Sequence, residues 1–228
     1  MFIDPYYIVL VLPALLLGLW AQARVNSTFQ RFSRVRSFRG CTGAMAAEMI
    51  LRENGITDVT VEHISGNLTD HFDPRAKVIR LSDSVYSSSS IAAIGVAAHE
   101  AGHAVQHDTG YLPIQIRNLF VPVANIGSRV SIPLILLGVI FSFPKLISLG
   151  IVLFSAVALF QLITLPVEFN ASRRALRVLD ETGLLEGEEL AGAKKVLSAA
   201  AMTYVAALIA SVAQLLRLIG LFGRRRDD

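Results

Sequence analysis

The sequence predicts a mainly α-helical, multi-pass membrane protein that also carries a small α+β unit. Of its 228 residues, 53% are hydrophobic and only 17% are charged, against about 25% charged residues in an ordinary soluble domain. The apolar residues are gathered into blocks, and a polar segment with both helix and strand patterns separates the first block from the second. The single cysteine excludes a disulfide scaffold and a thiolate zinc cluster, so any metal would need histidine and carboxylate ligands.

The first apolar block is predicted to be a retained membrane anchor. Residues 5–23 form an uncharged run of 19 residues, close to the length that crosses a hydrocarbon core about 30 Å thick. A cleaved signal peptide is the alternative. It is disfavoured because only MFIDP, without a basic residue, precedes the apolar stretch, and Trp20 lies where an aromatic side chain would anchor at the membrane interface.

Three further apolar runs follow. Residues 146–167 are long enough to span, and residues 130–144 form a short run that becomes a span if it extends back to about residue 123. Pro144 and Lys145 would then form the turn of a hairpin. Three placements stay open for the last run, residues 196–216, because small and polar side chains share one of its faces: across the membrane, packed on the other helices, or on the membrane surface.

Residues 24–118 are predicted to fold as the polar unit. Thr42 can cap a helix, and one of the serines at 87–90 can cap the longer helix that follows. Alternating side chains predict strands at residues 59–64 and 77–81.

The second of these helices carries the motif HEAGH, which is the strongest chemical signal in the chain. His99 and His103 lie one turn apart on one helical face, where both imidazoles can bind one Zn²⁺ at about 2.0–2.1 Å. Glu100 points to the side, where a carboxylate can take a proton from zinc-activated water. The alternative is an exposed helix that carries two histidines by accident.

A catalytic zinc needs a third protein ligand. His107 is disfavoured because it lies about 12 Å along the helix from His99. Glu168, directly after the third apolar run, is the better candidate, although glutamate at a helix start is common without a metal. For Glu168 to reach His99, the intervening chain must cross the membrane an even number of times, so the short second run should also span.

The stretches DHFDPRAKVIRLSDSVYSSSSIAAIGVAAHEAGHAVQH and PVEFNASRRAL resemble the YugP-type neutral zinc metallopeptidases, and the resemblance covers nearly the whole chain. The chain is also similar, more distantly, to the HtpX and CAAX-prenyl type membrane metallopeptidases. The resemblance implies a zincin-like unit with Zn²⁺ as cofactor, with His99, His103 and Glu168 as its ligands and Glu100 as the catalytic base. Ser172 stands where the distant group has an aspartate near a ligand histidine. By the same analogy, residues 77–81 would be an edge strand that receives the substrate by strand addition.

These features predict a membrane-bound zinc endopeptidase that cleaves protein or peptide substrates in or near the lipid bilayer. His71 and Tyr86 are possible oxyanion donors, with a turn-stabilising role as the alternative for His71. Two other functions stay open: an intramembrane protease of the site-2 type, disfavoured by the short apolar run before His99, and a catalytically silent membrane scaffold. A nucleic-acid partner is excluded because no aromatic-interleaved basic patch exists, and the oligomeric state stays open.

Basic residues predict the orientation. Five arginines follow the first span, so the positive-inside rule places the catalytic unit in the cytoplasm, at what we expect to be a bacterial cell membrane. The arginines at 224–226 would oppose the rule if the last run spans. The predicted division is an anchor at 1–23, the catalytic unit at 24–118, a transmembrane hairpin at 119–167, the helix with the third ligand at 168–195, and a hydrophobic helix with a basic tail at 196–228.

Overall fold

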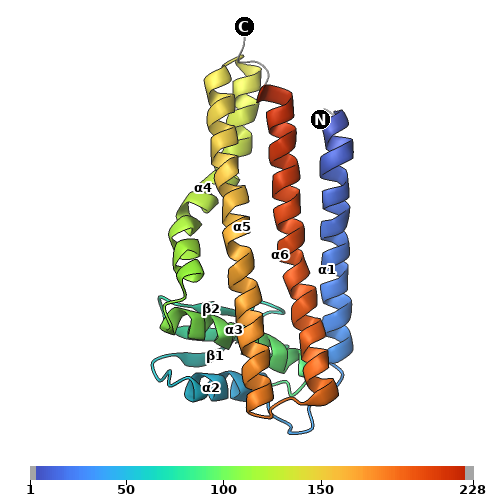
Figure 1. The fold of residues 1–228 in the computed structure, drawn as a ribbon, viewed down its shortest axis with the longest axis vertical. Coiled ribbons are helices and arrows are strands. Elements are labelled where there is room, and N and C mark those ends of the chain that lie inside the picture. The colour runs from blue at the N-terminus through green and yellow to red at the C-terminus, as the bar shows by residue number, and fades with distance from the viewer. Residues whose placement is uncertain (1–3, 224–228) are drawn as a thin grey trace. The chain divides into compact units, whose positions relative to one another are not determined.

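The computed structural model describes residues 4–223, and it is mostly helical with one small sheet (Figure 1). The chain separates into two compact units. A helical unit contains residues up to 22, residues 115–166 and residues from 202 onward, and an α+β unit contains residues 23–114 and 167–201. The elements in chain order are η1 (Tyr7–Val11), α1 (Leu12–Phe32), α2 (Gly43–Glu53), β1 (Thr60–Ile64), β2 (His71–Asp73), β3 (Val78–Ser82), α3 (Ile91–Asp108), α4 (Leu112–Ile140), α5 (Pro144–Glu181) and α6 (Gly187–Phe222).

Four helical segments of the described chain are long and apolar enough to cross a membrane: Tyr7–Phe32, Leu112–Ile140, Pro144–Glu181 and Gly187–Phe222. The prediction of several membrane-spanning helices is confirmed by helix length and apolar composition. The last apolar run lies within α6, which has the length and composition of a fourth span. The predicted break between the third span and the Glu168 helix is absent, because α5 continues through Pro166 as one helix.

Close backbone packing joins α4 to α5 within the helical unit. A Cβ atom added at Gly127 would lie 2.7 Å from the carbonyl oxygen of Leu153, and one added at Gly150 would lie 2.8 Å from that of Ser131. Small residues are typical of helix contacts in membranes, where van der Waals packing replaces the hydrophobic effect.

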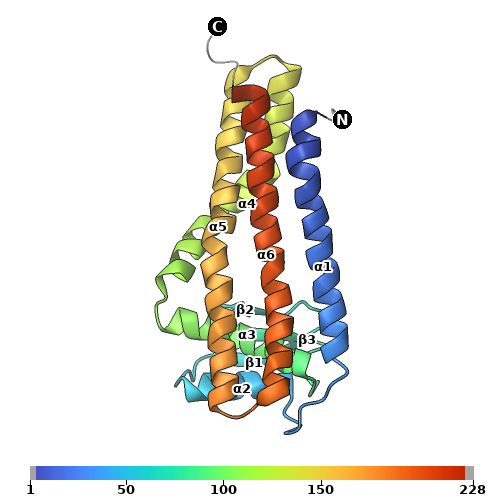
Figure 2. The same ribbon diagram turned by 45° about the vertical axis from the view of Figure 1, so that its right-hand side comes forward.

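The same unit holds the end of α6 beside the start of η1. The Arg217 guanidinium donates to the Asp4 carboxylate through two nitrogens at 2.9 and 2.6 Å. Figure 2 shows α6 and the first helix running side by side. Both side chains are partly buried, where pairing stabilises a charge, so the pair brings the two ends of these helices together.

The two predicted caps of the α+β unit are confirmed. The hydroxyl of Thr42 accepts a hydrogen bond from the Met45 backbone N–H at 3.3 Å, and that of Ser90 accepts one from the Ala93 N–H at 3.2 Å. These bonds satisfy N–H groups that the first turn of a helix leaves without intrahelical partners. They begin α2 and α3 at the positions that the sequence predicts.

The sheet corrects one expectation. Its order is β1-β3-β2, with β1 parallel and β2 antiparallel to β3. The predicted strand at residues 77–81 exists as β3, but it is the central strand, so the proposal that it receives a substrate at a free edge is wrong. The short strand β2 was not predicted, and it occupies the edge that β3 would otherwise expose.

The core of the α+β unit lies where α3 packs among the sheet, α2 and the parts of α5 and α6 that belong to this unit. Ile79 and Leu81 of β3 are fully buried, as is the row of alanines along α3. Small side chains on α3 let neighbouring backbones approach closely. That close approach places α5 directly against the face of α3 that carries the histidines.

Candidate metal centre

The site forms where α3 meets α5 within the α+β unit. His99 and His103 come from α3, and Glu168 comes from α5. Gly102 sets the distance between the helices, because a Cβ atom added there would lie only 2.7 Å from the carbonyl oxygen of Ala171. A glycine next to the second histidine therefore lets the two backbones touch and brings the Glu168 carboxylate to both imidazoles.

The three side chains converge at ligand distances. Oε2 of Glu168 lies 3.2 Å from Nε2 of His99 and 3.6 Å from Nε2 of His103. The candidate ligand atoms all lie within 4.8 Å of one another. Four ligands at about 2.0–2.1 Å around a tetrahedral zinc lie roughly 3.3 Å apart. The spacing fits one zinc ion, and three protein ligands would leave the fourth position open.

Burial supports the same interpretation. His103 and Glu168 expose only 8% and 2% of their surface. Burial alone would lower the pKa of His103, but the Glu168 carboxylate and the charge of Glu100 outweigh it and raise that pKa above its ordinary value. A site with such buried carboxylate charge favours a cation, whether a proton or a metal ion.

Comparison with known proteins agrees with this geometry. Residues 7–223 match a protein family described as "Putative neutral zinc metallopeptidase". The chain belongs to this family. It is also 49% identical to "Putative membrane protease YugP" from Bacillus subtilis (strain 168) over 222 residues, which cover 97% of this chain and 99% of that protein. No solved structure matches the chain.

In this member of the zinc metallopeptidase family, Glu100 lies beside the triad and is held by the sheet. Its Oε2 accepts a hydrogen bond from the backbone N–H of Phe72 in β2, at 3.1 Å. The Phe72 N–H therefore points away from the hydrogen bonds that pair β2 with β3. The strand that sequence reasoning missed is thus the element that contacts the predicted base.

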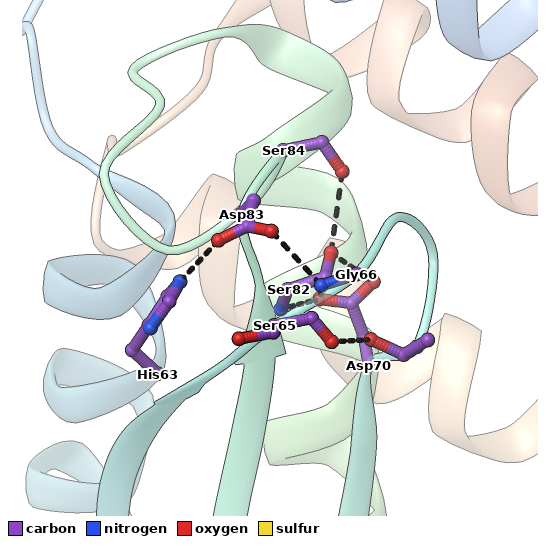
Figure 3. Close-up of polar contacts among 8 residues, drawn as sticks. His63, Ser65, Gly66, Asp70, Ser82, Asp83 and Ser84 are labelled. Atoms are coloured by element: carbon purple, nitrogen blue, oxygen red, sulfur yellow. Dashed lines mark hydrogen bonds and ion pairs between the residues drawn. The ribbon is translucent and has the colours of Figure 1, made fainter.

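A polar network fixes the start of β2 (Figure 3). Asp70 accepts hydrogen bonds from the backbone N–H of Ser82 at 2.8 Å and from its hydroxyl at 3.0 and 3.1 Å. Asp83 contacts His63 at 2.6 Å and accepts from the N–H of Gly66 at 2.9 Å. Burial raises the pKa of the Asp70 carboxyl, against the hydrogen bonds from Ser82. The network ties the loop before β2 to the end of β3.

Each candidate histidine ligand has a partner on its second nitrogen. Ser172 Oγ lies 3.1 Å from Nδ1 of His99, and Gln106 Oε1 lies 3.0 Å from Nδ1 of His103. Ser172 therefore lies beside a candidate ligand, at the position that the sequence analysis singled out. Sequence reasoning missed Gln106, but a signal existed: seven residues after His99, it is a polar side chain on the same helical face.

The contacts of the two predicted oxyanion donors, and of the disfavoured ligand His107, are made outside the triad. His71 contacts the Thr69 carbonyl through Nδ1 at 2.9 Å, and the Tyr86 ring packs edge-on against that of His63 at 5.6 Å. His107 lies in the last turn of α3, where its ring packs against that of Phe72. The role of His71 and Tyr86 as oxyanion donors stays a prediction.

Proposed function

We propose that this chain is a membrane-bound zinc endopeptidase in which His99, His103 and Glu168 hold the metal and Glu100 is the general base. The observation that supports this most strongly is the convergence of two imidazoles and a buried carboxylate at zinc-ligand spacing. The family assignment supports the same cofactor. Glu100 follows His99 in the chain, and its charge acts on His103, which supports a position near the metal.

The chemistry divides between the metal and the chain. Zinc supplies Lewis-acid chemistry there, since it polarises carbonyl groups and acidifies water. Glu100 takes a proton from the attacking water and later gives it to the leaving amine. The C–N bond breaks, the water oxygen joins the carbonyl carbon, and both water protons are retained in the products. The Phe72 N–H keeps the Glu100 carboxylate oriented between these transfers.

The substrate strand is proposed to lie along β2. This strand is an edge of the sheet, and one of its outward N–H groups faces Glu100. The Phe72 N–H already donates to Glu100, so an extended peptide at this edge would pair with other backbone groups of β2 and bring its own backbone to the base. The polar unit would face the cytoplasm, as the arginines after the first span indicate. Membrane or membrane-proximal proteins are therefore the proposed substrates.

The deciding experiment compares the purified protein with its Glu100→Gln variant. We expect one zinc per chain in both, with cleavage of unfolded membrane-protein substrates by the parent alone. A matched His103→Gln variant should lose zinc and activity together. A parent that holds no zinc after metal-replete purification would contradict the proposal. Equal cleavage by the parent and Glu100→Gln would remove Glu100 from the chemistry, and a zinc-loaded but inactive parent would favour the scaffold alternative.

A further inference from the structure

The side chain of Gln106 is fully buried between α3 and α5 and uses both ends of its carboxamide. Its Nε2 donates to the backbone carbonyl of Val167 at 2.8 Å and to Oδ1 of Asn170 at 3.0 Å. Its Oε1 lies 3.0 Å from Nδ1 of His103. A buried, fully paired amide of this kind is costly to replace, because each partner would lose its hydrogen bond.

These contacts determine which end of the amide is which. A backbone carbonyl only accepts hydrogen bonds, so the atom that faces Val167 must be the NH₂ nitrogen. The oxygen of Gln106 therefore faces His103, and an amide oxygen can only accept. Nδ1 of His103 must then carry the proton. In the neutral imidazole this leaves the lone pair on Nε2, the nitrogen that faces Glu168 at 3.6 Å.

A second amide supports this orientation. Oδ1 of Asn170 accepts from Gln106 and also from Nε of Arg174, at 2.8 Å. Two donors on one atom require that atom to be the amide oxygen. The guanidinium of Arg174 lies over the ring of Tyr111, 5.8 Å from its centroid. Hydrogen bonds and ring contact thus connect the candidate ligand to residues on both helices and beyond the end of α3.

We infer that Gln106 is a positioning residue that fixes His103 as the Nδ1–H tautomer and presents Nε2 to the metal. The role rests on the proposed zinc site, because a fixed lone pair matters only where a metal is bound. His99 differs, since the Ser172 hydroxyl at its Nδ1 can donate or accept and does not select a tautomer. The partner of His103 therefore selects its tautomer, whereas the partner of His99 does not.

The first test uses the whole protein in detergent, without metal. Nitrogen-15 NMR of labelled histidines at alkaline pH reports which ring nitrogen carries the proton. The chain has five histidines, and a His103→Gln variant identifies the signal of His103. We expect His103 to be protonated on Nδ1 in the parent. Protonation on Nε2, or a mixture of both tautomers, would overturn the inference without any variant at Gln106.

The second test separates the two ends of the amide. Gln106→Leu removes both, so we expect mixed tautomers at His103 and a zinc affinity about 10–100-fold below that of the parent. Gln106→Glu keeps an acceptor for His103 and loses the donors to α5, so it should keep the tautomer. Ser172→Ala is the matched control, and it should leave the His103 signal unchanged. Parent-like tautomer and zinc affinity in Gln106→Leu would contradict the inference.

The two proposals can fail separately. The tautomer is measured without zinc or substrate, so a parent that binds no zinc would contradict the proposed function and leave the tautomer result standing. A zinc-binding parent with His103 protonated on Nε2 would contradict only the role of Gln106. If Gln106→Leu does not fold, the parent spectrum still decides the inference.

Discussion

Replacing Gly102 by alanine should weaken zinc binding while the protein still folds. The new Cβ would lie 2.7 Å from the Ala171 carbonyl oxygen and 3.2 Å from its carbonyl carbon. Ordinary contact begins near 3.4 Å, so α3 and α5 must separate by about 0.7 Å. The obstacle is a backbone atom of a helix, which no change of side-chain rotamer can move.

The expected magnitudes follow from that displacement. Overpacking a core costs about 1–3 kcal/mol, and the higher helix propensity of alanine returns about 1 kcal/mol. The free energy of unfolding should therefore fall by no more than about 2 kcal/mol. Functional sites tolerate only about 0.5 Å of misplacement. Glu168 moves with α5, so we expect zinc affinity to drop at least about tenfold.

Gly95 provides the matched control on the same helix. A Cβ atom there would meet the Ala193 side chain at 3.4 Å, which is ordinary contact. Gly95→Ala should keep the zinc affinity of the parent and its stability, or gain slightly in stability. Chelator competition measures the affinity, and thermal unfolding of the metal-free protein in detergent measures the fold. Zinc affinity in Gly102→Ala within about twofold of the parent would refute the argument that helix separation builds the site.

Two further predictions concern β2 and its support. Phe72→Pro removes the N–H that faces Glu100, whereas Phe72→Ala keeps it. The proline variant should therefore have a kcat about tenfold lower than the alanine variant at equal zinc content. Equal kcat values would exclude a role for that N–H. Burial raises the pKa of Asp70 above 3.8, so the folded chain holds a proton that the unfolded chain has lost, and the contribution of Asp70 to the unfolding free energy of the metal-free parent falls as pH rises through that window. Asp70→Asn should remove this contribution. Denaturant titrations at several pH values measure how the unfolding free energy depends on pH, and the same dependence in both proteins would contradict the prediction.

Features that depend on local sequence were predictable. Length and apolar composition predicted the membrane helices, because the bilayer sets a minimum run of apolar residues. Thr42 and the serines at 87–90 predicted the starts of α2 and α3, since a capping hydroxyl acts only within its own first turn, and the structure shows Ser90 to be the second cap. Helical periodicity alone placed His99 and His103 on one face. Each of these inferences needs only a few neighbouring residues.

Features that depend on contacts between distant segments were not predictable in the same way. The central position of β3 follows from its pairing with β2, a strand of three residues inside a turn-rich stretch that carries no alternating pattern long enough to detect. Gln106 lies on the histidine face of α3, but the orientation of its amide depends on the Val167 carbonyl, which α5 supplies from a distant part of the sequence. Tertiary contacts override local signals wherever the local signal is this short.

The register between α3 and α5 explains why two stretches of sequence must be considered as one site. Along α3, His99 meets Ser172, Gly102 meets Ala171, and Gln106 meets Val167, so the contacts advance along α3 as they go back along α5. A slip of one helical turn, about 5.4 Å, would separate all of these pairs together. The register between α3 and α5 therefore determines three features: the convergence of the candidate ligands, the orientation of both imidazoles and the close backbone contact. A substitution anywhere along this contact should be judged first by whether it shifts that register.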